Sequence, residues 1–425
     1  MAFLLTLLYI VLTVLSPAEL FPDLAPYRIM LWLSLLAILW SVAGFFSAPW
    51  LKLPQFRLML GIILAICLSR LLNGWLGGVG PALADFLPAA IVFFLVLWNL
   101  SSLARLRWLS TTLILIAIYY IAQGALAYHS GDETSPFVYV QRVSGGGSAA
   151  SPASYLRIRA LGFLNDPNDF AQFLLMLLPF AFTAWMKGKV ARNFCLCVAP
   201  AVALLYGIYL TSSRGALLAL AVLIVFLVKD RLGARRGALF LPVAVALILA
   251  LNQTGRAISV HEDSALGRVN AWSEGLGMFQ SSPLWGIGYG LFTEHNELTA
   301  HNSFVLCLSE LGLIGTFAWL GLLVACVLHL QESSRRCAAA GDSETGRWAF
   351  ALRLSLYTTL ATCWFLSRTY SLPLYLLLGM AAALSVQTAH LAPAEPQPVR
   401  WPWVTAMLLP ALTAMVYVTV RMRAL

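Results

Sequence analysis

His301 is the residue of this sequence whose position best suits acid–base chemistry. It lies in the segment Thr299-Ala-His-Asn-Ser-Phe304, at the start of the long apolar run 302–330. If that run is a helix, its positive N-terminal end disfavours the imidazolium form, and the ring stays neutral, as a general base must. The alternative is that His301 caps the helix or fills an interface.

Two arginines stand at comparable positions. Arg214 lies in the short segment Tyr209-Leu-Thr-Ser-Ser-Arg-Gly-Ala-Leu217 between two apolar runs, where Ser212 or Ser213 can cap the following helix. The free N–H groups at that helix start, together with the guanidinium, favour an anion. Arg268 opens a second predicted helix and is a candidate for the same anion. A purely structural role is the alternative for each arginine.

The elements that position these residues are membrane helices. Of the 425 residues, 60% are apolar and 11% are charged, whereas soluble globular proteins carry roughly 25% charged residues. This composition excludes soluble enzymes and DNA-binding modules. We predict an all-α polytopic membrane protein with about 12 transmembrane helices, 12 or 13, in a single transmembrane domain over residues 1–425. The apolar runs are 2–16, 27–46, 56–72, 84–100, 108–128, 169–186, 193–212, 215–229, 237–251, 302–330, 347–366, 370–389 and 402–420.

The basic residues differ in type between the two sides of the membrane. Five runs hold 14 of the 27 lysines and arginines, and all five are cytoplasmic when the N-terminus lies inside: 52–57, 105–107, 187–192, 229–236 and 335–347. The basic residues of the predicted outer side are all arginine: Arg28, Arg70, Arg142, Arg157, Arg159, Arg214, Arg256, Arg268 and Arg368. Guanidinium binds phosphate oxygens in a bidentate fork, so this set indicates a phosphate-bearing outer ligand. Any single arginine can instead snorkel to lipid headgroups.

Two predicted outer loops are long, over residues 129–168 and 252–301. The first contains a Gly/Ser-rich stretch at 144–152, which is typical of a mobile linker. Arg157 and Arg159 follow it, and their spacing of two points both side chains the same way if the segment is extended.

The second outer loop has two recognisable segments. Apolar residues recur at helical spacing near 268–280, as Val269, Trp272, Leu276 and Phe279. This pattern predicts an amphipathic, interfacial helix at the membrane surface. The segment Gly286-Ile-Gly-Tyr-Gly290 resembles a nucleotide-binding loop only in its glycines, so we interpret it as a tight turn that allows close backbone approach.

The sequence predicts no metal site and no cofactor. Asp166 and Asp169 flank Pro167-Asn168 ahead of an apolar run, a pattern typical of helix capping. The other outer carboxylates are scattered, and no spaced set of histidines and cysteines is present. The seven cysteines lie almost wholly in apolar runs, which favours a packing role.

Three stretches together resemble the O-antigen ligase and polymerase superfamily of bacterial envelope glycosyltransferases. They are Thr211-Ser-Ser-Arg-Gly-Ala-Leu217, Pro283-Leu-Trp-Gly-Ile-Gly-Tyr-Gly290, and Ala300-His-Asn-Ser-Phe-Val305 with Ser309-Glu-Leu-Gly312. The similarity runs from roughly residue 160 to 370. It implies a GT-C-like membrane fold in the bacterial inner membrane and a metal-independent transfer on the periplasmic face. The donor would be a glycan carried on undecaprenyl diphosphate.

The resemblance also assigns roles to residues. His301 would be the catalytic base, and Arg214 and Arg268 would bind the diphosphate. Single displacement would invert the anomeric carbon. Further candidates for contacts with donor or acceptor are Arg157, Arg159, Asn168 and Asn302.

The members of the superfamily differ in their acceptor. We favour an O-antigen ligase, whose acceptor is a sugar of the lipid A–core, with membrane lipid as a further partner and no nucleic acid. A polymerase, which extends another repeat unit, and a protein O-oligosaccharyltransferase are alternatives within the superfamily. From another class, an organic-anion transporter would use the arginines for selectivity.

Overall fold

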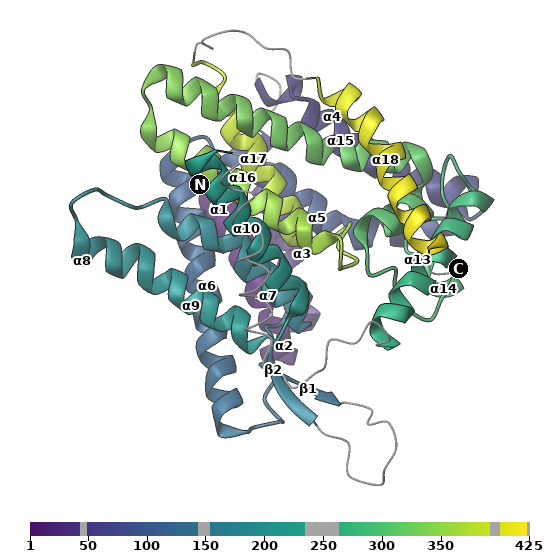
Figure 1. Ribbon diagram of the computed structural model, residues 1–425, viewed down its shortest axis with the longest axis horizontal. Coiled ribbons are helices and arrows are strands. Elements are labelled where there is room, and N and C mark those ends of the chain that lie inside the picture. The colour runs from purple at the N-terminus through teal and green to yellow at the C-terminus, as the bar shows by residue number, and fades with distance from the viewer. Residues whose placement is uncertain (43–48, 143–153, 234–262, 392–399, 423–425) are drawn as a thin grey trace. The chain divides into compact units, whose positions relative to one another are not determined.

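The residues that the structure describes fold mostly into helices (Figure 1). The computed structural model describes residues 1–42, 49–142, 154–233, 263–391 and 400–422. Within them, six helices are long and apolar enough to cross a membrane: Pro54–Leu72 (α4), Leu76–Asn99 (ending in α5, Val79–Asn99), Leu103–Ser130 (α6), Val190–Leu210 (ending in α9, Ala199–Leu210), Ser303–Ala340 (α15) and Trp401–Arg421 (α18). Shorter apolar helices are Ala2–Leu15 (α1), Ile29–Ser41 (α3) and Leu372–Thr388 (α17). The chain is therefore a polytopic membrane protein. Its described residues contain six helices of full span length, and the sequence predicted 12 or 13 spans over the whole chain.

One predicted span is not a single helix. Over residues 169–186, the helix α7 (Pro167–Leu177) ends and a 3₁₀ helix, Leu178–Phe182, follows. Pro179 lies at this junction, and its ring nitrogen cannot donate the hydrogen bond that would continue α7. The predicted span 237–251 and the linker 144–152 lie outside the described residues.

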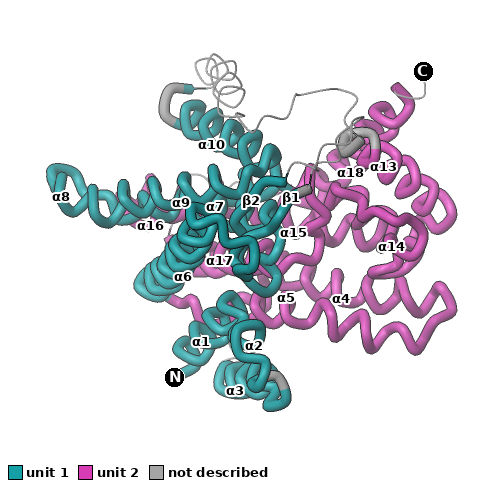
Figure 2. The backbone as a smooth tube through the Cα atoms, turned by 90° about the horizontal axis from the view of Figure 1, so that it is seen from below, with its two compact units in different colours: residues 1–43, 102–254, 354–362 teal, residues 44–101, 255–353, 363–425 magenta. Residues whose placement is uncertain are grey.

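The chain forms two compact units, shown in different colours in Figure 2. Unit 1 comprises Met1–Ala43, Ser102–Thr254 and Leu354–Thr362, and unit 2 comprises Gly44–Ser101, Gly255–Arg353 and Cys363–Leu425. Arg214 therefore belongs to unit 1, whereas Arg268 and His301 belong to unit 2.

The core of unit 1 is built around α7. All of its residues except Asn168 are buried, including the polar Asp169 and Gln172, so protein covers this helix on almost every side. It packs against α9 and against α10 (Arg214–Leu232). The second half of α16 (Ser343–Cys363) also contacts it, because the Ser355 hydroxyl donates to the Met176 carbonyl at 2.7 Å.

Unit 1 also contains the only strands among the described residues. Val138–Arg142 (β1) pairs antiparallel with Ser154–Ile158 (β2), with Tyr139 opposite Arg157. The all-α prediction missed this hairpin, although β1 contains Val and Tyr and β2 contains Tyr and Ile, which are residue types common in β-sheets. Ile158 packs on α6 at Gly124, where a Cβ would approach its side chain to 3.0 Å.

In unit 2, α15 is the central helix. It packs against α4, α17, α18 and α13 (Asp263–Ser281), while α17 packs against α5. The predicted amphipathic helix corresponds to α13, and its polar and apolar faces are those expected: Trp272 and Leu276 are buried, and Ser273 and Glu274 are exposed. The buried face contacts α15 and α18, so protein covers it rather than lipid.

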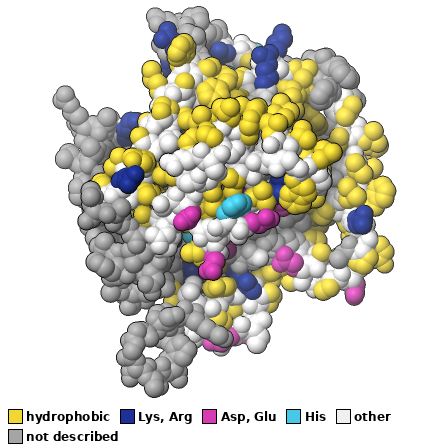
Figure 3. All heavy atoms as spheres, turned by 90° about the vertical axis from the view of Figure 1, so that its right-hand side faces the viewer, with side chains coloured by type: hydrophobic (Ala, Val, Ile, Leu, Met, Phe, Trp, Pro, Cys, Tyr) yellow, Lys and Arg dark blue, Asp and Glu magenta, His cyan; other side chains and the backbone are white. Residues whose placement is uncertain are grey.

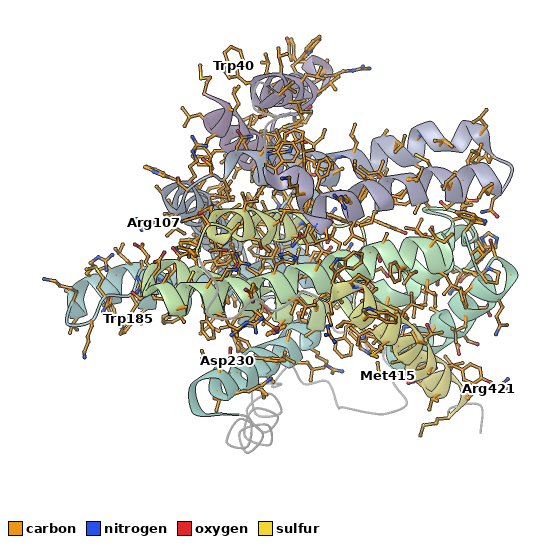
Figure 4. All side chains as sticks on the ribbon, turned by 90° about the horizontal axis from the view of Figure 1, so that it is seen from above. Trp40, Arg107, Trp185, Asp230, Met415 and Arg421 are labelled. Carbon is orange, nitrogen blue, oxygen red and sulfur yellow. The ribbon has the colours of Figure 1, made fainter. Side chains whose placement is uncertain are left out.

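Apolar side chains are exposed on several helices. On α18 they include Trp403, Met407 and Met415, and Figure 4 shows Met415 and Arg421 projecting from this helix. The Arg421 Nε donates to the Tyr417 hydroxyl at 3.1 Å, one turn earlier. Figure 3 shows hydrophobic side chains spread widely over the face that it draws, with a histidine near the middle and acidic side chains beside and below it. Such an apolar surface is expected where lipid is the solvent.

Candidate functional site

The long helix α15 is broken at Gly312. There the backbone has φ 61° and ψ −162°, a conformation that is essentially restricted to glycine. In a continuous helix, the carbonyls of Ser309 and Glu310 would accept hydrogen bonds from the N–H groups four residues later. The break separates these groups. Two carbonyls and two N–H groups of the backbone must therefore find hydrogen-bond partners elsewhere.

The segment 283–290, called here the glycine loop, pairs with all four. Its Ile287 and Gly288 N–H groups donate to the carbonyls of Ser309 and Glu310 at 2.9 and 3.1 Å. In return, Leu313 and Ile314 donate to the carbonyls of Pro283 and Leu284 at 2.8 and 3.3 Å. Backbone N–H and C=O groups that protein buries need such partners, because an unpaired buried group costs free energy.

Glycines make this close approach possible. A Cβ on Gly286 would lie 2.2 Å from the backbone carbon of Glu310, and Gly286, Gly288 and Gly290 all have positive φ. The prediction of a tight turn that brings backbone close to another helix is therefore confirmed. The buried Glu310 adds a side-chain contact, because its Oε1 accepts from the Phe292 N–H at 3.1 Å.

Tyr289 attaches the glycine loop to α4 and α5. Its N–H donates to the Ser69 hydroxyl at 3.1 Å, and its own hydroxyl donates to Asp85 Oδ2 at 2.6 Å. Burial, and secondarily the bond to Asp85, raises the pKa of Tyr289 well above its usual value. The hydroxyl therefore remains a donor at any physiological pH.

Arg70, at the last turn of α4, lies beside the same loop. The side chain is only 8% exposed, and its guanidinium carbon lies 4.8 Å from the ring centre of Trp75. A Cβ on Gly290 would lie 3.5 Å from Arg70 Nη2. Arg70 is thus enclosed by protein rather than extended toward headgroups.

The segment 299–303, called here the histidine turn, precedes α15. His301 adopts a left-handed conformation with φ 47°, one of four non-glycine residues with positive φ among the described residues. The conformation is uncommon outside glycine, and strain of this kind persists only where neighbouring contacts enforce it.

Contacts hold the histidine turn on both sides of His301. Before it, the Ala300 carbonyl accepts from the Trp272 indole N–H at 3.0 Å. After it, Asn302 caps α15, because its Oδ1 accepts from the N–H groups of Phe304 and Val305 at 2.9 and 3.1 Å. The capping alternative thus applies to Asn302 and not to His301, which precedes the cap.

Arg268 is placed near this turn by α13. It lies four residues before Trp272, on the same face and about 6 Å along the helix. Because Trp272 contacts Ala300, the structure brings the Arg268 turn of α13 to the neighbourhood of the histidine turn within unit 2.

Arg214 in unit 1 is the first residue of α10. Ser213 caps this helix, with its hydroxyl accepting from the Ala216 N–H at 3.4 Å. Ser212 before it has φ 49°. The predicted cap is therefore present at Ser213, and Arg214 lies beside the helix start as expected.

Arg157, in β2, stabilises the segment that precedes Arg214. Its Nε donates to the Thr211 carbonyl at 2.7 Å, and its Nη2 donates to Asn168 Oδ1 at 3.0 Å. The side chain is 7% exposed. Asn168 belongs to the first turn of α7, which Asp166 caps through a bond from the Asn168 N–H at 2.7 Å. The structure thus brings Arg157 and Asn168 together with the segment that precedes Arg214.

Arg159 lies apart from this group. Its Nε donates to the Pro136 carbonyl at 3.0 Å, and its guanidinium lies 6.0 Å from the Tyr139 ring centre. Arg159 therefore stabilises the hairpin. Its partners differ from those of Arg157, although only one residue separates the two arginines and β2 is extended as expected.

We expect Arg157→Lys to destabilise unit 1 by about 3 kcal/mol, because lysine cannot reproduce buried guanidinium hydrogen bonds of about 1.5–3 kcal/mol each. Denaturant unfolding in detergent measures the change. Arg159→Lys is the matched control, since it alters the same residue type in the same loop at a half-buried site, with a smaller expected effect of about 1 kcal/mol. Equal effects of the two substitutions would contradict the supporting role of Arg157.

The described residues contain no group of three or more His, Cys, Asp or Glu side chains arranged to hold a metal ion. Sequence reasoning missed the break in α15, because the apolar run 302–330 is uninterrupted in hydropathy. The available signal was Gly312 itself, followed by Gly315, in a segment that is otherwise rich in good helix formers.

One part of the chain matches a known protein family. Residues 199–320 match the sequence model of the family described as O-antigen ligase. The matched segment contains Arg214, Arg268, the glycine loop, the histidine turn and the break at Gly312. None of the curated proteins matches the chain.

Proposed function

This chain is a member of the O-antigen ligase superfamily, and on that premise we propose that it is the ligase itself. The ligase would transfer a glycan from undecaprenyl diphosphate to a lipid A–core sugar. The family match points to a glycosyltransferase-like enzyme of O-antigen and lipopolysaccharide biosynthesis. It lends no support to an organic-anion transporter. The inner membrane as location, a periplasmic site and a GT-C-like fold belong to the same proposal.

The observation that carries the proposal is the constrained conformation of His301. A left-handed, non-glycine residue between two fixed neighbours is the kind of backbone outlier that clusters at functional sites. Its position before the N-terminus of α15 also favours a neutral imidazole. Both properties suit a general base that must meet a hydroxyl in a defined direction.

The proposed reaction is a single displacement. His301 takes the proton of an acceptor hydroxyl while the hydroxyl oxygen attacks the anomeric carbon of the donor sugar. The bond from that carbon to the diphosphate oxygen breaks, undecaprenyl diphosphate leaves, and the configuration of the carbon inverts. We assign binding of the diphosphate to Arg214 and Arg268, whose charge would stabilise the leaving group where negative charge develops. Diphosphate is a good leaving group, so the proposed step needs no metal.

Asn302 is proposed to contact a substrate as well. Its Oδ1 is committed to the helix cap, but its buried Nδ2 has no hydrogen-bond partner among the described residues. An unsatisfied buried donor costs about 1–3 kcal/mol, which a bound hydroxyl or phosphate oxygen would offset. Arg157, Arg159 and Asn168 were also candidates for such contacts. Their guanidinium and amide groups are used within unit 1, so we assign them support rather than contact.

We expect Asn302→Asp to remain folded but to lower transfer by about tenfold or more, equivalent to about 1.4 kcal/mol. Aspartate caps helices as well as asparagine does, yet its carboxylate has no N–H to offer. The readout is kcat/KM beside the unfolding midpoint, and Asn302→Ser provides a neutral capping residue as the control for charge. Wild-type transfer by both variants would show that Asn302 only caps α15 and does not contact a substrate.

We expect Lys to replace Arg poorly at positions 214 and 268, with donor binding and transfer reduced by about tenfold or more. An ammonium group keeps the charge but not the bidentate fork. Arg28→Lys is the control, because Arg28 is an exposed arginine that the sequence also places on the outer side. Equal, mild effects at all three positions would contradict diphosphate binding by Arg214 and Arg268.

A deletion strain distinguishes the members of the superfamily. Loss of a ligase should leave lipid A–core without polymer while long lipid-linked polymer accumulates. Loss of a polymerase should instead leave lipid A–core that carries single repeat units, and loss of a protein O-oligosaccharyltransferase should leave lipopolysaccharide unchanged. Either of the last two phenotypes would overturn the ligase assignment.

A further inference from the structure

We propose that Ser303 and Thr369 position His301, acting as a clasp between the start of α15 and the loop 366–369. The inference rests on the proposed function, because it concerns the geometry of the base in that reaction. Ser303 belongs to the stretch Ala300–Val305 by which the sequence resembles its family, whereas Thr369 lies outside those stretches.

Ser303 lies two residues after His301 and makes three hydrogen bonds to the loop 366–369. Its hydroxyl donates to the Leu366 carbonyl at 2.6 Å and accepts from the Arg368 N–H at 2.8 Å. Its carbonyl accepts from the Thr369 hydroxyl at 2.6 Å. Ser303 and Thr369 are both completely buried. A further contact joins the hydroxyls of Thr299 and Ser367, so the loop holds the histidine turn at both of its ends.

Thr369 also connects this turn to the second half of α15. Its carbonyl accepts from the Trp319 indole N–H at 3.1 Å. Ser303 and Trp319 are 16 residues apart, which corresponds to about 24 Å along an uninterrupted helix, too far for one threonine to reach both. The break at Gly312 brings both within reach, so the position of the clasp depends on the glycine loop that stabilises the break.

The clasp would hold His301 in its strained backbone conformation. Left-handed backbone at a non-glycine residue is retained only where the surroundings over-determine it. Without the Thr369 bond, the first turn of α15 can shift relative to the loop, and the imidazole shifts with it. A misplacement of about 1 Å can cost 10²-fold in rate even when the altered residue does not touch the reacting atoms. Ser303 and Thr369 are therefore positioning residues.

The test compares two substitutions at one buried position. Thr369→Val removes the hydroxyl but keeps the side-chain shape, whereas Thr369→Ser keeps the hydroxyl. Ser303→Ala removes the hydroxyl that bonds the Leu366 carbonyl and the Arg368 N–H, and it serves as a second route if the valine variant does not fold. The matched control is Thr388→Val, since Thr388 is also a buried threonine of unit 2 with a bonded hydroxyl, 2.7 Å from that of Ser333.

The readouts are kcat and KM for glycan transfer by the purified full chain, with lipid-linked glycan and lipid A–core extracted from the deletion strain. We expect Thr369→Val to lower kcat by about 10- to 100-fold with little change in KM, and Thr369→Ser and Thr388→Val to retain kcat within about twofold. In a His301→Asn background, Thr369→Val should have no further effect on residual transfer, because a clasp that acts through His301 has nothing left to position.

The outcomes separate the clasp from the function on which it rests. Near wild-type transfer by His301→Asn would overturn the proposed base itself. If His301→Asn fails but Thr369→Val matches Thr369→Ser, the clasp is wrong and the base stands. An equal loss from Thr369→Val in both backgrounds, or a parallel loss in Thr388→Val, would show a general packing effect and also overturn the clasp.

Discussion

Replacing His301 by asparagine is expected to lower kcat for glycan transfer by about 10²–10⁴-fold without unfolding the protein. The fold should survive because asparagine, like histidine, is tolerated in the left-handed conformation that this position requires. What is lost is a nitrogen that can take a proton near neutral pH, since a carboxamide cannot act as a base.

A second substitution distinguishes the role of the imidazole ring from that of the strained backbone conformation. His301→Gly removes the side chain and also relieves the backbone strain, so it should be at least as stable as the asparagine variant and equally inactive. The measurements are the initial rate of transfer and the unfolding midpoint in the same detergent. Transfer within threefold of wild type by either folded variant would contradict the role of His301 as the base.

Gly312→Ala is expected to have the largest effect on stability, about 2–6 kcal/mol. About 1–3 kcal/mol arises from placing a Cβ in a backbone region that is almost exclusive to glycine. A similar amount arises from overpacking, because the new Cβ would lie 2.5 Å from the backbone carbon and oxygen of Leu284. Neither group can move without releasing the glycine loop from the break.

Two other glycines make the result interpretable. Gly341 lies in the left-handed helical region (φ 71°, ψ 11°) with nothing within 4 Å of its Cβ position, so Gly341→Ala measures left-handed backbone strain without overpacking. Gly277 lies on α13 with open space around it, and alanine there should be neutral or slightly stabilising. We expect denaturant unfolding to rank the losses as Gly312, then Gly341, then Gly277. A Gly312 variant as stable as the Gly341 variant would refute the close docking of the glycine loop.

Local sequence patterns predicted much of this structure. The stripe from Val269 to Phe279 correctly indicated a helix and its two faces, because a 3.6-residue period is a property of the segment itself. The caps at Ser213 and Asp166 follow the same rule, since capping joins residues only two or three positions apart. For the same reason, the helix start beside His301 could be located from the residues around it.

The features that sequence reasoning missed depend on residues far apart in the chain. Hydropathy does not register the break in α15, because Gly312 interrupts the backbone and not the apolar run. Arg157 was a candidate for substrate contact by residue type, and its bonds to Asn168 and Thr211 could not be foreseen, because these partners lie 11 and 54 residues away. The clasp joins residues 66 positions apart. The acceptor and the sugar leave no local pattern at all, which is why the choice among ligase, polymerase and protein transferase remains a proposal.

Transfer by the purified chain tests the central claim most directly. The protein in detergent would receive undecaprenyl-diphosphate-linked glycan and lipid A–core, and both products would be followed with time. We predict that glycan-bearing lipid A–core and free undecaprenyl diphosphate appear in equal amounts, that lipid A–core is required for release, and that His301→Asn abolishes both. Extension of the lipid-linked glycan without any transfer to lipid A–core would contradict the account.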